Sequence, residues 1–195
     1  MSVSGIGVLY FLIIVVANAV GSVSGMGGGV IIKPVLDFVG HDSVVAISFY
    51  STVAVFTMSL VSTIRQVQAG RKIQWQQVAY LALGSVLGGY LGNQTFELLL
   101  QRAEQAGQVT LIQIAVTVAL LVFAMIYTRY ENFHWSKQGA LWYSAVGLSL
   151  GFFASLLGIG GGPINVSLLM LVFAMPIKEA TVYSIATIFC SQLTK

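Results

Sequence analysis

Charged side chains are scarce in this sequence, and their scarcity argues against a soluble fold. Only 8% of the 195 residues are charged and 57% are hydrophobic, whereas about 25% of the residues in a soluble domain are charged. Several apolar stretches reach the roughly 17–25 residues that a helix needs to cross a bilayer. We therefore expect an all-α integral membrane protein with several spans.

Cysteine is almost absent too, and Cys190 alone excludes an internal disulfide and a thiolate metal cluster. The net charge of +3 is small and spread over expected loops, so it indicates no nucleic-acid partner. The glycine clusters are followed by Val30 and Pro163 rather than by the lysine of an ATP-binding loop. No metal-ligand constellation lies within an apolar stretch. The sequence thus predicts neither an enzyme nor a cofactor.

A glycine-rich motif occurs twice, as Gly25-Met-Gly-Gly-Gly29 and Gly158-Ile-Gly-Gly-Gly162, and the two copies lie 133 positions apart (158 − 25). The residues that match at this offset include Ile31 with Ile164, Val39 with Val172, Tyr50 with Tyr183, Ser51 with Ser184, Phe56 with Phe189 and Leu60 with Leu193. A shared register over about 35 residues indicates a duplicated unit. We expect a first membrane repeat over 1–130 and a second over 139–195, the second incomplete at its C-terminal end.

The apolar runs predict the helices and their orientation. Helices are expected over 5–24, 30–39, 44–64, 77–91, 109–127 and 140–157, followed by a short piece to 175 and a last helix to the end. The loop 65–75 has three basic residues and no acid, so we expect it in the cytoplasm. The loop carrying Glu97 and Glu104 is then outside, and 129–137 is inside again.

The relation between the two repeats depends on 30–39. If this piece crosses the membrane, one repeat has five crossings and the second copy is inverted. If it only re-enters, there are four crossings and the copies are parallel. Two Gly-broken helices that face each other at the midplane would form one central site, which favours the inverted topology.

The glycine clusters predict an anion site at membrane depth. Four glycines in five positions would cost a plain helix about 1 kcal/mol each relative to alanine. In return they expose amide N–H groups that a ligand can approach closely. The helix that starts at each cluster points its positive dipole end at the loop, which favours an anion. The alternative is close helix packing, since Gly21, Gly25 and Gly29 recur at every fourth residue.

The candidate substrate-binding residues are the cluster glycines and four polar side chains. They are Gly25, Gly27, Gly28, Gly29, Gly158, Gly160, Gly161, Gly162, Ser51, Ser184, Asn165 and Lys33. Lys33, the only basic residue well inside an apolar segment, attracts an anion, or else it snorkels or pairs with Asp37. Ser51 and Ser184 line the site or bond to their own helix carbonyls. Asn165 binds substrate or joins helices.

With these motifs the chain resembles the sulfite exporter TauE/SafE family. The resemblance rests on Gly21-Ser-Val-Ser-Gly25-Met-Gly-Gly-Gly29 with Pro34 after it, and on the second copy from Gly151 to Gly162. It implies a multi-span permease of the plasma membrane that exports or takes up sulfite, sulfonates or related small anions. The chain departs from the pattern at Ser167, the counterpart of Pro34, and in the missing last spans.

The combined expectation is a secondary transporter of small anions. Its partners are the anion and the lipid bilayer, and a homo-oligomer is left open. The alternatives are an anion channel, and a structural or assembly protein whose glycines only pack helices. The sequence gives neither the substrate, the transport direction nor the coupling ion.

Overall fold

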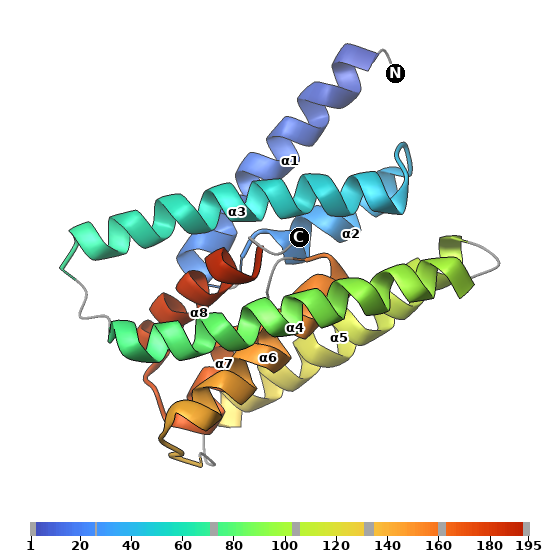
Figure 1. The fold of residues 1–195 in the computed structure, drawn as a ribbon. Coiled ribbons are helices and arrows are strands. Elements are labelled where there is room, and N and C mark those ends of the chain that lie inside the picture. Colours follow the sequence, from blue (N-terminus) through green and yellow to red (C-terminus); the bar gives the residue numbers. More distant parts are fainter. Residues whose placement is uncertain are drawn as a thin grey trace.

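The computed structural model describes residues 3–25, 27–70, 74–102, 106–130, 135–159 and 163–192, and every element in these ranges is an α-helix (Figure 1). The helices are α1 (Val3–Ser24), α2 (Gly29–Val39), α3 (Val44–Gln68), α4 (Trp75–Arg102), α5 (Ala106–Tyr130), α6 (Ala140–Leu157), α7 (Pro163–Phe173) and α8 (Ile177–Gln192). This confirms the all-α fold class.

Both glycine clusters interrupt helices, as predicted. α1 ends just before Gly25 and α6 ends just before Gly158, and these two glycines have φ angles of 72° and 68°. A left-handed residue after the last turn ends a helix, and glycine adopts it without a steric penalty. The short helices α2 and α7 follow, and α7 begins at Pro163, whose missing N–H is not needed in the first turn.

The predicted end of the fourth helix at position 91 is wrong. α4 continues to Arg102, so Glu97 lies in the helix and not in a loop. Asn93 Nδ2 donates to Glu97 Oε1 at 2.9 Å along the surface of this added part. The glycines at positions 84, 88 and 92 do not end the helix, because the backbone of a neighbouring helix packs directly against them.

α4 and α6 lie side by side (Figure 1) and approach each other closely at their glycines. A Cβ on Gly84, Gly88 or Gly92 would overlap the backbone of α6, and a Cβ on Gly147 or Gly151 would overlap the backbone of α4. Glycines at this spacing let two membrane helices approach closely. This seam joins α4 to α6, and further contacts of α3 and α4 with α8 and of α5 with α7 connect the first five helices to the last three.

The outer surface is apolar over wide areas. Side chains such as Phe11, Val16, Val23 and Phe38 are exposed, as expected where a protein faces lipid tails. Four helices of the described ranges are long and apolar enough to cross a membrane, over Ile6–Ser24, Val44–Gln68, Gly107–Arg129 and Ala140–Leu157. The expected span in α4 is not among them, since its Asn, Gln and Gly residues make it less apolar.

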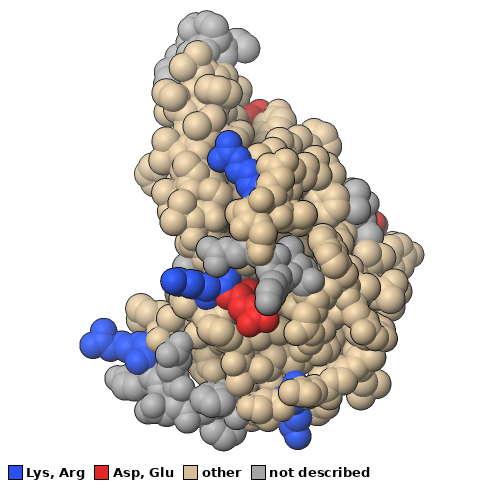
Figure 2. Space-filling model, turned by 90° about the vertical axis from the view of Figure 1, so that its left-hand side faces the viewer, with Lys and Arg blue, Asp and Glu red and all other residues tan. Residues whose placement is uncertain are grey.

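Basic residues gather at one end of the molecule. α3 runs from right to left in Figure 1 and ends near Arg65, α5 ends near Arg129 on the same side, and α8 starts there beside Lys178. Figure 2 shows this side, with separate blue groups and a red acidic group next to one of them on a mostly tan surface. The predicted cytoplasmic side of the loop 65–75 stays a prediction, as do the repeat boundaries at 1–130 and 139–195.

Candidate functional site

The two glycine turns touch each other. A Cβ on Gly29 would overlap the backbone of Ile159, and a Cβ on Gly28 would overlap Asn18 of α1. Gly21 of α1 is equally close to the backbone of Gly27 and Gly28. These glycines therefore serve close packing in addition to any binding role. The predicted site residues Gly160, Gly161 and Gly162 lie outside the described residues.

The glycine turn at Gly25 also packs on α8, and the glycine turn at Gly158 packs on α3. A Cβ on Gly25 would overlap Thr181 of α8, and a Cβ on Gly158 would lie 2.9 Å from Ser48 Oγ of α3. Thr181 and Ser48 are themselves 133 positions apart. Phe56 of α3 stacks on its counterpart Phe189 of α8, with ring centroids 5.4 Å apart. These contacts join positions that the expected repeat makes equivalent, and the repeat and its orientation stay predictions.

The first glycine turn is closed by a hydrogen bond. Ser184 is fully buried, and its Oγ donates to the Gly25 carbonyl at 2.9 Å. The expected alternative, a bond to its own helix, is seen instead at Thr187, whose Oγ1 donates to the Tyr183 carbonyl at 2.8 Å. Ser184 thus satisfies a carbonyl that the end of α1 leaves free. The position that matches Lys33 at the offset of 133 residues is Val166, so the second copy of the motif carries no charge at this position.

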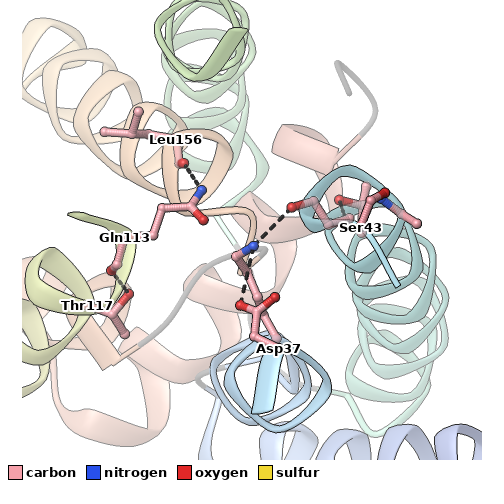
Figure 3. Close-up of polar contacts among 9 residues, drawn as sticks. Asp37, Ser43, Gln113, Thr117 and Leu156 are labelled. Atoms are coloured by element: carbon pink, nitrogen blue, oxygen red, sulfur yellow. Dashed lines mark hydrogen bonds and ion pairs between the residues drawn. The ribbon is translucent and has the colours of Figure 1, made fainter. Parts of the chain in front are cut away.

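The second glycine turn has a buried cation beside it. The Lys33 side chain is only 3% exposed, and its Nζ donates to Ser48 Oγ at 3.1 Å. Asp37 Oδ2 lies 3.7 Å from Nζ, and a dashed line joins the two in Figure 3. The Lys33 Cδ atom lies 3.4 Å from the position of a Cβ on Gly158. Pairing with Asp37 is therefore confirmed, and the snorkelling alternative is wrong because the amine is buried.

Some buried polar atoms of the helices that pack at this turn have no protein partner. Within the described residues these include Ser155 Oγ, Gln113 Oε1 and Ser51 Oγ, and also Asn165 Oδ1 of α7, all in side chains at most 3% exposed. Ser155 lies three residues before Gly158, and Ser51 lies one turn beyond Ser48 in α3. A buried polar atom left unpaired costs about 1–3 kcal/mol. A polar ligand or water at the turn would complete the bonding of the atoms that face it.

Gln113 is a site residue that the sequence prediction missed. Its Nε2 donates to the Leu156 carbonyl at 2.8 Å, two residues before Gly158 (Figure 3). Its signal was a buried amide in an otherwise apolar run over 109–127. Ser48 and Ser155 were also missed, since ordinary membrane helices contain many serines.

Two cavities flank the glycine turns. One of about 150 Å³ is lined by Ser48, Thr52, Asn93 and Ser155 with apolar neighbours, next to the second turn. The other, of about 440 Å³, is lined by apolar side chains of α5 and by Ser24, Ser167, Thr128 and Arg129. Ser24 adjoins Gly25, so this cavity lies next to the first turn. Each turn thus has a cavity beside it whose lining is mostly apolar and includes a few hydroxyl groups.

The equivalent serines of the two units should respond in opposite ways to alanine. Ser184→Ala leaves the Gly25 carbonyl unpaired and is expected to lower the free energy of unfolding by about 1–3 kcal/mol. Ser51→Ala removes a hydroxyl without a protein partner, so stability should be unchanged or slightly higher. Thermal unfolding of the two purified variants in the same detergent measures this difference. Equal destabilisation by both changes would contradict the assignment of different roles.

Comparisons with known proteins agree with this architecture. The family model described as Sulfite exporter TauE/SafE matches residues 10–195. The chain is also similar to the probable membrane transporter protein YunE of Bacillus subtilis (strain 168). The two sequences are 28% identical over an alignment of 210 residues, gaps included, which covers 94% of this chain and 76% of that protein. No solved structure matches the chain. The expectation of a multi-pass membrane transporter is confirmed at this level, and the chain belongs to the sulfite exporter TauE/SafE family.

Proposed function

We propose that this transporter is a secondary permease for a small anion, and that the anion binds beside the second glycine turn. The observation that carries the proposal is Lys33, a buried cation against Gly158 and close to unpaired hydroxyls. Ionisable residues inside a membrane are costly and mark substrate or ion pathways by default. The Lys33 amine is paired with Asp37, but it also faces the second glycine turn and the Ser48 hydroxyl, and a cation among hydrogen-bond donors favours an anionic ligand.

The chemistry of the site suits an oxyanion with several acceptor atoms. Lys33 Nζ supplies charge and up to three N–H donors, and Ser48, Ser51 and Ser155 supply hydroxyls. The first turn of α7, which begins at Pro163, adds the free N–H groups of Ile164 and Asn165, where the helix dipole is positive. Sulfite and organosulfonates present three oxygens that such donors can share. The family name, sulfite exporter, supports this substrate class.

The two units form an inverted pair around this site. α3 and α8 run in opposite directions in Figure 1, and the reciprocal contacts of Gly25 with Thr181 and of Gly158 with Ser48 support the relation. Broken helices at the interface of inverted repeats are where many secondary transporters bind their substrates. The basic end faces the cytoplasm of a cell whose plasma membrane holds the protein.

Efflux from proteoliposomes tests the proposed function. Protein expressed from its complete reading frame is reconstituted, and the vesicles are loaded with labelled sulfite, isethionate, chloride or rubidium. We expect saturable release of the sulfur anions and none of rubidium. Release that does not saturate would favour the anion channel. Equal or absent release of all four solutes would favour the structural alternative, in which the glycines only pack helices.

A further inference from the structure

We propose that the Asp37 carboxylate binds one proton for each monovalent anion that binds beside Lys33, so that the two ions cross together. The inference rests on the proposed function and adds its coupling ion. It starts from the only ion pair of the described residues that lies within the helices: Lys33 and Asp37 face each other across one turn of α2, 3.7 Å apart.

The surroundings of Asp37 leave Lys33 as its counter-charge. Ser48 of α3 holds the Lys33 amine, but it is neutral. From α1, Tyr10 interacts electrostatically with Asp37, and it also meets Asp42 in the turn after α2 and Tyr50 of α3. Asp42 Oδ1 lies 3.4 Å from His41 Nδ1, and both of these side chains are more exposed than Asp37. The empty site therefore holds one positive and one negative charge.

An incoming anion breaks this balance. It shares the single cation with the Asp37 carboxylate, which leaves one net negative charge in a region of low dielectric, where an uncompensated charge is expensive. Two like charges around one site are relieved when one of them takes up a proton. Protonation of Asp37 gives a neutral carboxylic acid and leaves the cation to the anion, so the occupied site is neutral again.

The access of the two groups to water fits this division of roles. The Asp37 side chain is 11% exposed, whereas the Lys33 side chain is 3% exposed. The carboxylate is thus the more accessible partner of the pair, and in the proposed cycle it is the group that exchanges a proton while the amine stays shielded. When the anion leaves on the opposite side, Asp37 returns its proton to water and pairs with Lys33 again. One complete cycle moves one negative and one positive charge, and is electrically neutral.

Simultaneous measurement of anion and proton movement tests the inference. Isethionate is the chosen probe, because a sulfonate stays ionised at neutral pH and carries no proton of its own. Vesicles containing labelled isethionate and the pH dye pyranine are diluted into isethionate-free buffer. We expect one proton to leave per isethionate, and a release rate that does not change when potassium and valinomycin impose a membrane potential.

Substitutions at position 37 assign the proton to this carboxylate. Asp37→Asn should still release isethionate, but without protons and at a rate that follows the membrane potential. Asp37→Glu keeps a carboxylate and should keep the one-to-one ratio. Asp42→Asn is the matched control: it makes the same chemical change five residues away, at a carboxylate that pairs with His41, and should leave the ratio unchanged.

The outcomes separate the two proposals. Selective isethionate release without protons by the unaltered protein overturns the coupling and leaves the anion transporter standing. Unchanged proton release by Asp37→Asn also overturns it, since the proton then binds elsewhere. Absence of selective anion release by the unaltered protein removes both proposals. If Asp37→Asn does not fold, the double variant Lys33→Met with Asp37→Asn, which removes both charges of the pair, takes its place, and a proton ratio of zero for the unaltered protein still overturns the coupling.

Discussion

Replacing Lys33 with methionine is expected to abolish anion release while the protein still inserts into the membrane. Two unit charges about 4 Å apart interact by about 4 kcal/mol at an effective dielectric constant of about 20. Loss of that attraction corresponds to a roughly 100- to 1,000-fold weaker affinity. Methionine keeps the length and apolar stem that pack beside Gly158. The measurement is labelled sulfite efflux from vesicles with matched amounts of protein.

Two further variants make the Lys33 result specific. Lys137→Met removes an exposed lysine whose amine lies 5.5 Å from the centre of the Trp142 ring, and it should not affect efflux. Lys33→Met alone leaves Asp37 without its partner, and an unpaired charge destabilises the protein. The double variant Lys33→Met with Asp37→Asn removes both charges and should recover stability but not efflux. Normal efflux by the double variant would place the anion site elsewhere.

Replacing Gly88 with valine is expected to force α4 away from α6. The added Cβ would overlap the Leu148 carbonyl group, and backbone cannot move aside as a flexible side chain can. Overpacking of a close interface costs about 1–3 kcal/mol, and occasionally more. At about 2–4 °C per kcal/mol, the unfolding midpoint should fall by about 6–12 °C if the cost reaches 3 kcal/mol. Unfolding of the detergent-solubilised protein, followed by loss of the monodisperse peak on size-exclusion chromatography, measures it.

Gly107 is the matched control for this seam. It lies in the first turns of α5, and a Cβ there meets nothing within 4 Å. Gly107→Ala should leave the midpoint unchanged or raise it slightly, because alanine is the better helix former. An unchanged midpoint for Gly88→Val would mean that the seam is looser than described, and that the glycines of α4 have another purpose.

The sequence predicted most of the helices because long apolar runs identify membrane helices well. α6 was predicted at its observed bounds, and α1 and α2 began within two residues of their predicted starts. The end of α4 was mispredicted for a physical reason. Glycines every fourth residue suit both a weak, short helix and a tightly packed one, and only the neighbouring helix decides between them. The backbone of α6 supplies that missing information.

The site was less predictable than the fold. Lys33 and Asp37 were recognisable from their spacing, but burial of the amine depends on how α2 sits against α3 and the second glycine turn. Ser51 and Ser184 had equal status in the sequence, yet only Ser184 bonds a glycine carbonyl. Gln113 joins the site from a helix without a repeat counterpart in the chain, so the duplication gave no hint of it.

The contact between Gly29 and Ile159 has a mechanical consequence. Because no space for even one methyl group separates the two backbones, neither turn can move toward the other. A displacement of one turn is therefore transmitted directly to the other, and the cavities beside the two turns respond to the same movement. Under the proposed function, one mechanical element would then control both cavities that the anion passes.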